Sequence, residues 1–221
     1  MLLFSLWQKF LSRFGLWKNI ELKENTFIAR VLKSNELEKA YRFRYRVFCE
    51  ELRWFPPNNS KKENDHYDKF SVHFGVFSKK EELIGYSRII PPERNFMLEK
   101  EFKDLLDNHT IRKERDTIEV SRVAINKTSN FADSIDGVNI ISALLYKLMY
   151  KWSKKNRIRY WYMAIEPHYL KSLQELFSCK QIGKIKFYQP EIPTAAALLD
   201  LKETELFLHK KNKKLYNWFQ K

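Results

Sequence analysis

Two kinds of periodicity run along the chain, and each predicts a set of secondary-structure elements. Apolar and polar residues alternate in "SVHFGVF" (71–77), and "EELIGYSRII" (81–90) follows after a Lys-Lys turn, which indicates a β-hairpin. The segment "DGVNIISALLYKLMYKWSKK" (136–155) instead places apolar residues three and four apart, as an amphipathic helix does. By the same criteria we predict strands at 71–77, 81–90, 118–125, 159–167 and 184–189, and helices at 35–52, 98–106, 136–155 and 168–177.

Capping and turn residues support the first helix. Asn35 and Glu38 stand at capping-box spacing where it begins, and Pro56 and Pro57 follow its end. Helices and strands alternate with no internal repeat and no low-complexity linker. The predicted fold class is therefore α+β, with a mixed, largely antiparallel sheet flanked by helices. We expect one central domain, residues 24–201, between two basic ends.

The two ends have different patterns. Residues 1–23 predict an amphipathic helix with Lys9 and Arg13 on its polar side, and this helix either lies on a membrane surface or packs on its own domain. Residues 202–221 hold six lysines against two acids and are typical of a basic tail at the surface or against a membrane. No apolar run approaches the roughly 20 residues that span a bilayer.

The net charge of +14 points to an anionic partner, namely nucleic acid, a membrane or an acidic protein. The two ends account for +3 and +4, which leaves +7 spread over 24–201. That central part has no Lys/Arg run dense enough for a nucleic-acid groove, so we expect no nucleic-acid partner. The two cysteines, Cys49 and Cys179, indicate neither a disulfide framework nor a metal site. They favour a reduced, cytoplasmic protein, with the inner face of the cytoplasmic membrane as a second location.

Charged residues interrupt the apolar segments in a way that calls for compensation. The buried-looking strand "EVSRVAI" carries Glu119 and Arg122, and residues three apart in a regular strand point to opposite faces. A buried charge costs several kcal/mol unless it is paired and hydrogen-bonded. Further candidates for one shared ion cluster are Arg44 on the first helix, Arg88 in "IGYSRII", and Glu63, Asp65 and Asp68 in "ENDHYD". A β-bulge could also bring Glu119 and Arg122 onto one face.

The order of these residues resembles that of the acyl-homoserine lactone synthases: Arg44-x-x-x-Phe48, Trp54, Glu63-x-Asp65-x-x-Asp68, Arg88, Phe102 and Glu119-x-x-Arg122. Other phrases are more similar to the sister group of N-acyl amino acid synthases and exosortase-associated acyltransferases, namely "RYRVFCEE", "DHYDKFSVH", "EVSRVAI" and "YWYMAIEPHYLKSLQ". The resemblance covers residues 35 to 200. It implies the fold of the GCN5-related N-acetyltransferases, and transfer of a fatty acyl chain from acyl carrier protein to an amine.

The resemblance also implies roles for the residues. The donor would be the acyl-phosphopantetheine of acyl carrier protein, with no tightly bound cofactor and no metal. The carboxylates expected to hold the acceptor ammonium group and receive its proton are Glu63, Asp65, Asp68 and Glu119. Arginines suit an acceptor carboxylate because a guanidinium binds it bidentately, and aromatic residues would line the acyl tunnel or order the 53–68 loop. These expected substrate-binding residues are Arg44, Arg88, Arg122, Phe48, Trp54 and Phe102. Backbone N–H groups near "SRVAI" are the expected oxyanion donors.

For two other reactive side chains, a role outside the reaction is favoured. His73 could serve as the base, but a hydrogen-bonded structural histidine is the favoured interpretation. Cys49 has no paired histidine in its "VFCEE" helix, so we do not expect it to relay the acyl group.

A carrier-protein donor fits two further features. The place where coenzyme A-dependent acetyltransferases have a glycine-rich turn reads "NKTSNFADSIDGVN", with Gly137 alone. Basic residues on and after the 136–155 helix form the expected docking surface for the acidic carrier protein, the alternative being a solvated lysine face. These residues are Lys147, Lys151, Lys154, Lys155 and Arg157.

The acceptor distinguishes the two leading functions. An N-acyl amino acid synthase would acylate a free amino acid and is the first expectation. An acyl-homoserine lactone synthase, which makes a quorum-sensing signal, would acylate S-adenosylmethionine and then close the lactone. A non-catalytic, membrane-peripheral basic protein is the alternative from another class, but it leaves the arginines in the strands unexplained.

Overall fold

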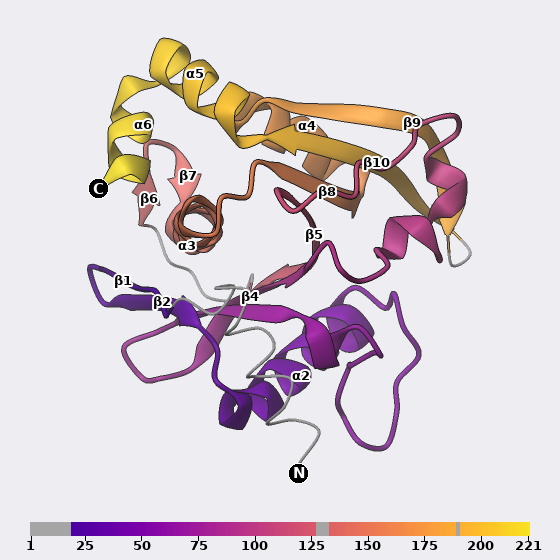
Figure 1. Ribbon diagram of the computed structural model, residues 1–221. Coiled ribbons are helices and arrows are strands. Elements are labelled where there is room, and N and C mark those ends of the chain that lie inside the picture. The colour runs from indigo at the N-terminus through magenta and orange to yellow at the C-terminus, as the bar shows by residue number, and fades with distance from the viewer. Residues whose placement is uncertain (1–18, 127–132, 189–190) are drawn as a thin grey trace.

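A mixed eight-stranded sheet runs through the centre of the protein in the computed structural model, which describes residues 19–126, 133–188 and 191–221 (Figure 1). In sheet order, the strands are β1 (Glu21–Glu24), β2 (Phe27–Val31), β3 (Val72–Phe77), β4 (Leu83–Ile90), β5 (Thr117–Ile125), β8 (Tyr160–Ile165), β10 (Ile192–Asp200) and β9 (Cys179–Tyr188). Every neighbouring pair is antiparallel except β5 and β8. The α+β architecture predicted from the sequence is confirmed.

Helices cover both faces of the sheet. The α-helices are α2 (Leu37–Tyr45), α3 (Ile140–Lys155), α4 (Pro167–Leu176), α5 (Leu201–Lys211) and α6 (Lys213–Gln220). Shorter turns are η1 (Ser34–Glu36), the π-helical η2 (Arg46–Glu51), η3 (Asp68–Phe70), η4 (Met97–Glu99) and η5 (Lys103–Leu105), and a small hairpin joins β6 (Ser134–Ile135) to β7 (Val138–Asn139). The largest core lies between the sheet and α3 to α6, while α2 and the η4–η5 segment pack on the opposite face.

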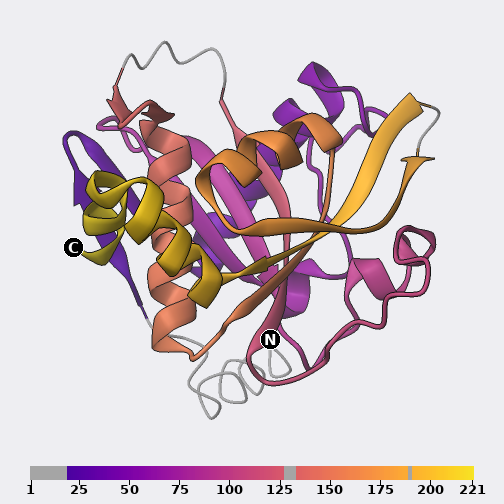
Figure 2. The same cartoon turned by 90° about the horizontal axis from the view of Figure 1, so that it is seen from above.

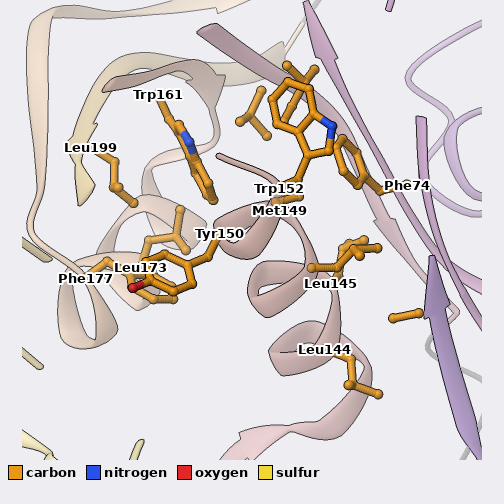
Figure 3. Packing of buried hydrophobic residues seen from close by; sticks show 14 of the residues in the cluster. Phe74, Leu144, Leu145, Met149, Tyr150, Trp152, Trp161, Leu173, Phe177 and Leu199 are labelled. Carbon is orange, nitrogen blue, oxygen red and sulfur yellow. The ribbon is translucent and has the colours of Figure 1, made fainter. Parts of the chain in front are cut away.

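Helix α3 is the centre of the largest core. Asn139 caps it, since its side chain accepts hydrogen bonds from the backbone N–H groups of Ile141 and Ser142. Figure 3 shows α3 between Phe74 of β3 on one side and Trp161 of β8 on the other, with residues such as Leu145, Met149 and Trp152 filling the space. The rings of Trp152 and Phe74 meet edge to face at 5.8 Å. This packing holds the β5–α3–β8 crossover in place.

The two parallel strands at the centre of the sheet soon separate. β5 and β8 pair only at Thr117–Tyr160, Ile118–Trp161 and Glu119–Tyr162. Beyond that point β5 continues to Ile125 against β4, and β8 continues to Ile165 against β10. In the described residues, the edge of β5 that faces β8 is therefore not paired with it beyond Glu119.

Most predicted elements are present, but several differ in extent. The helix expected at 98–106 consists of two 3₁₀ turns, η4 and η5, rather than one helix. The strand expected last, at 184–189, is the second half of β9, and β10 follows it in the chain. β1 and β2 were not predicted. The amphipathic helix expected over 1–23 lies mostly outside the described residues, and its final part, from Glu21, is strand β1.

The C-terminal segment is also different from a surface tail. Leu208 of α5 and Leu215 and Phe219 of α6 are buried in the largest core. The ring of Phe219 packs edge to face against Tyr150 of α3 and Phe177 at the end of α4. Residues 202–221 therefore form part of the folded domain. No helix within the described ranges is both long and apolar enough to cross a membrane.

Candidate active site

The charged residues predicted to form one ion cluster meet between α2, the 63–68 segment, β4 and β5. Arg44 of α2 is fully buried. Its Nε donates to Glu63 Oε2 at 2.5 Å, and its Nη1 donates to Asp68 Oδ1 at 2.6 Å. The 63–68 segment is held to the helix by its backbone as well, because the Glu63 N–H donates to the carbonyl of Tyr41 at 3.0 Å. Helix and loop are thus fixed to each other by charge-assisted hydrogen bonds.

Arg88 binds two acids of the cluster and a serine of β5. This residue is also fully buried, on β4. Its Nη1 and Nη2 donate to the two oxygens of Asp65 at 2.5 and 2.8 Å, and Nη1 also donates to Asp68 Oδ1 at 2.7 Å. Its Nε donates to the hydroxyl of Ser121 at 2.9 Å. Ser121 lies directly opposite Arg88 on β5, so this hydrogen bond follows from the strand register.

A β-bulge brings Arg122 to the same cluster. Tyr86 pairs with Ala124 and Arg88 pairs with Ser121, so the one residue of β4 between these pairs faces two residues of β5. Arg122 lies in this bulge with a left-handed φ of +56°. Its Nε donates to Glu63 Oε1 at 3.2 Å and its Nη2 to Asp65 Oδ2 at 3.0 Å. The bulge turns Arg122 to the face of Arg88, which a regular strand would not do.

The three guanidinium groups balance three carboxylates, those of Glu63, Asp65 and Asp68. Burial opposes the ionisation of Asp65, but the hydrogen bonds and charge of Arg88, together with the charges of Arg122 and Arg44, outweigh it and hold its pKa well below the ordinary value. The pKa of Asp68 is also lowered, since Arg88 and Arg44 outweigh burial. These two carboxylates are therefore ionised partners of the arginines and are poor proton acceptors.

Glu119 is not part of this ion cluster, which corrects the expectation from the sequence. The carboxylate is 1% exposed and accepts hydrogen bonds from the backbone N–H groups of Met97 at 2.6 Å and Leu98 at 3.0 Å. Burial raises its pKa to about 7, against the lowering effect of these two N–H groups. Two amides of η4, rather than an arginine, compensate this side chain. A buried carboxylate with a pKa near 7 is suited to accept a proton.

The expected structural role of His73 agrees with its surroundings. Its Nδ1 lies 2.7 Å from the hydroxyl of Tyr86, and its Nε2 lies 3.0 Å from the carbonyl oxygen of Asp68. Burial lowers the pKa of His73 to about 4, so the ring is neutral near pH 7. Cys49 is buried, and burial raises the pKa of its thiol, which does not favour a nucleophile.

The three expected aromatic residues fall into two places. Phe48, in the π-helical turn after α2, stacks on the half-buried Trp54 with ring centroids 5.6 Å apart. Arg122 lies over the ring of Phe55 at 4.9 Å and over Phe48 at 5.9 Å, so this group adjoins the ion cluster. Phe102 instead packs edge to face on Tyr188 of β9, in the core beneath η4 and η5. Phe102 is therefore not part of the aromatic group around Arg122.

The lysine surface expected on α3 is not presented as one open face. Lys147 is only 6% exposed and lies over the ring of Trp218 at 4.0 Å. Lys151 donates to the carbonyl of Gln220 at 2.6 Å, and Lys154 forms an ion pair with Glu205 at 2.7 Å. Helices α5 and α6 thus pack against the first part of this surface. Lys154, Lys155 and Arg157, at the end of α3, have exposed side chains.

Two contributors to the site were absent from the sequence-based set. Ser121 accepts a hydrogen bond from Arg88, and Phe55 is the nearer of the two rings over which Arg122 lies. Both are neighbours in sequence of predicted residues, and that adjacency was the available signal. Within the described ranges, no group of three or more His, Cys, Asp or Glu side chains is arranged to hold a metal ion.

Known proteins resemble this chain in sequence over most of its length. A model of the family described as autoinducer synthase matches residues 29–202. An acyl-homoserine-lactone synthase from Vibrio anguillarum is 25% identical over 150 residues, which are 66% of this chain and 76% of that protein.

Solved structures resemble it in fold. The acyl-homoserine lactone synthase LasI has a TM-score of 0.71 and 18% identity, over 85% of this chain and 96% of that one. BjaI, a coenzyme A-dependent acyl-homoserine lactone synthase solved with S-adenosylmethionine and isopentyl-coenzyme A, has a TM-score of 0.67 and 19% identity, over 80% and 82%. FeeM, an N-acyl amino acid synthase from uncultured soil microbes, has a TM-score of 0.61 and 22% identity, over 83% and 96%.

The family match covers the segment that contains the ion cluster, the bulge at Arg122 and the point where β5 and β8 separate. It extends over more than half of the chain. The protein therefore belongs to the autoinducer synthase family, and it is an acyltransferase.

Proposed function

We propose that the protein transfers an acyl group from a thioester to the amine of S-adenosylmethionine and is an acyl-homoserine lactone synthase. The observation that carries this proposal is the placement of Glu119 and Arg122 on β5, where this strand separates from β8. Within the part of the chain that the structure describes, a proton acceptor, a cation for a carboxylate and strand edges that are no longer paired between β5 and β8 lie there together. The names of the relatives support the lactone route over the amino acid route that we first expected.

Arg122 is the arginine that would bind the acceptor carboxylate. Arg44 and Arg88 are fully buried and donate hydrogen bonds to the three acids of the cluster. The side chain of Arg122 is 13% exposed, and among the described residues its Nη1 has only a 4.0 Å contact to the sulfur of Met97. A carboxylate approaching over Phe55 would add a charge-assisted hydrogen bond to this nitrogen. Asp65, whose side chain is 20% exposed, is the acid nearest to Arg122 that could face the acceptor ammonium group.

Glu119 would receive the proton of that ammonium group through a water molecule. The amine nitrogen attacks the thioester carbon, a C–N bond forms and the C–S bond breaks, and the leaving thiolate takes up a proton. Backbone N–H groups of β5 beyond Glu119 would stabilise the intermediate oxyanion. The acceptor carboxylate then displaces the thioether at the carbon next to the sulfonium, which closes the lactone.

N-acyl amino acid synthesis is the second candidate, because FeeM shares the fold over 96% of its own chain. Both routes need the same acylation step and differ in the acceptor. The donor, acyl carrier protein or acyl coenzyme A, is a separate choice. A carrier protein is proposed because the segment before α3 contains a single glycine, Gly137, where coenzyme A-dependent acetyltransferases have a glycine-rich turn.

Mass spectrometry of purified protein reactions distinguishes the candidates. The protein is given an acyl thioester with either S-adenosylmethionine or a mixture of amino acids, and lipid extracts of expressing cells are analysed in parallel. We expect acyl-homoserine lactones in both experiments. N-acyl amino acids without lactones would show that the protein has the second function. If neither product forms with acyl carrier protein or with acyl coenzyme A as the donor, acyl transfer to these acceptors is refuted.

A further inference from the structure

The corner between α5 and α6 carries a dense group of lysines. Lys210, Lys211, Lys213 and Lys214 occupy four of five consecutive positions, and all four are exposed. We call these four residues the lysine corner. Asp136, on the β6–β7 turn, is the acid that forms an ion pair with one of these lysines among the described residues, and Glu205 of α5 is paired with Lys154 instead.

Two of the four lysines have contacts within the protein. Lys211 donates to the carbonyl of Glu175 at 3.3 Å, and Lys214 lies 3.7 Å from Asp136. Within the described part of the chain, the side chains of Lys210 and Lys213 make no hydrogen bond or ion pair. Their charges are therefore available to a partner, and their replacement removes no contact that stabilises the fold.

The lysine corner is held beside the beginning of α3. Asn212, in its middle, donates a hydrogen bond to Asp136 in the turn between β6 and β7, directly before α3. From there α6 runs along α3, with Trp218 on Lys147 and Gln220 on Lys151, and Figure 2 shows α5 and α6 alongside α3. The connection that leaves the end of β5 leads to the beginning of α3. The end of β5 lies beyond the point where β5 and β8 separate.

We propose that the lysine corner is the docking surface for the acidic carrier protein that brings the acyl thioester. This inference rests on the proposed acyl transfer. It places the docking surface at the lysine corner instead of on the first part of the lysine face of α3, which α6 covers. The corner lies beyond residue 202 and therefore outside the segment that the family model matches.

The charge of the lysine corner and the burial of the apolar side of α6 both favour a protein as its occupant. A group of four exposed lysines complements an acidic protein surface and steers its approach. An anionic membrane offers the same charge, but amphipathic helices bind membranes by inserting an apolar face. The apolar side of α6 is not available for this, because Leu215 and Phe219 are 1% and 4% exposed. The surface is therefore suited to a protein partner.

The test uses the full chain with Lys210→Glu and Lys213→Glu combined. Binding of acylated carrier protein is measured by titration at low salt, and turnover is measured with the carrier-borne donor and with acyl coenzyme A. We expect the Kd for the carrier protein, and the KM for the carrier-borne donor, to rise by about tenfold or more. The kcat and the KM for acyl coenzyme A should stay at the parent values.

A matched variant, Lys39→Glu combined with Lys79→Glu, changes the net charge equally at exposed lysines of α2 and the β3–β4 turn. It should keep the parent Kd for the carrier protein. The proposal is overturned if the two double variants bind the carrier protein alike. It is also overturned if the corner variant binds the carrier protein normally but loses binding to anionic phospholipid vesicles, which would assign the corner to a membrane. Failure of the proposed function is recognised separately, because the parent would then form no product with either donor.

Discussion

At the residue scale, the two charges of "EVSRVAI" are compensated by different means. Arg122 reaches Glu63 and Asp65 because a bulge turns it toward them. Glu119 stays buried among backbone amides and has a raised pKa of about 7. One short strand thus provides a cation that is fixed in position and an acid that can change its protonation state near neutral pH.

The first prediction concerns Arg122. The replacement Arg122→Met should abolish acyl transfer and lower the free energy of unfolding by about 3 kcal/mol, because Glu63 and Asp65 each lose a partner in a largely buried cluster. Turnover and chemical denaturation measure the two effects. The exposed Arg115→Met variant should behave like the parent. An active Arg122→Met protein with parent stability would contradict the role given to this cluster.

The second prediction concerns Glu119. The proposed base must be ionised, so kcat/KM of the parent should rise with pH and level off above about 7. Glu119→Gln should lower kcat/KM strongly and remove this part of the profile. Ionisation of the acceptor amine affects parent and variant alike, so the difference between their profiles isolates Glu119. An unchanged profile in the variant would exclude Glu119 as the base.

The same residue predicts how stability changes with pH. The pKa of Glu119 is higher in the folded state than its ordinary value of 4.5, so the folded state retains a proton between pH 4.5 and 7 that the unfolded state has lost. Its contribution to stability is therefore present below pH 4.5 and is lost as the pH rises to about 7. Denaturation at pH 5 and pH 8 should show a smaller decline for Glu119→Gln than for the parent. An equal decline in the two proteins would argue against the raised pKa.

At the element scale, β9 packs closely against η5 and holds together the core beneath η4 and η5. Gly183 of β9 has a φ of +65°, and a Cβ placed on it would lie 1.8 Å from the carbonyl oxygen of Leu105. The register of β9 against β10 shifts at the same level of the hairpin. Glycine is needed here for two reasons, the left-handed backbone and the approach of another backbone.

The third prediction compares two glycines. Gly183→Ala should lower the free energy of unfolding by about 3 kcal/mol or more, because strain and a backbone clash act together. Gly137→Ala is the control, since Gly137 has a φ of +82° and no atom within 4 Å of the added Cβ. It should cost only the strain of the left-handed conformation, about 1 kcal/mol. Equal losses in thermal or chemical denaturation would show that the contact with Leu105 does not matter.

At the scale of the whole molecule, α5 and α6 close the largest core around α3. Phe219 contacts rings of α3 and of the end of α4, and Trp218 donates to Glu24 of β1 at 3.2 Å. The end of the chain therefore connects the first strand of the sheet with the helices of the crossover. A segment with the composition of a basic tail contributes to the stability of the entire fold.

The fourth prediction concerns this closure. Phe219→Ala should lower the free energy of unfolding by about 3 kcal/mol, the usual cost of removing a buried aromatic ring. Gln220→Ala is expected to have a smaller effect, because Gln220 contributes a side-chain hydrogen bond to Tyr150 from an exposed position. If Phe219→Ala unfolds like the parent, α6 does not belong to the cooperative unit. Denaturation followed by circular dichroism decides between these outcomes.

The sequence by itself determined the elements whose pattern is local. Periodicity predicted α3, α4, the β3–β4 hairpin and β5, because each of these buries one face or is enclosed on both. The ordered acids and arginines also predicted the ion cluster, since charges placed in apolar elements must be compensated.

The tertiary structure decided everything that depended on the partner of a residue. β1, β2 and β10 are strands because of their neighbours in the sheet, and α6 is buried because α3 lies beneath it. The same applies within the site. The bulge in β5 places Arg122 in the ion cluster. The position of η4 allows two backbone amides, rather than an arginine, to bind Glu119. The positions of charged residues in apolar segments of the sequence show which charges need a partner. Strand register and packing determine which residue that partner is.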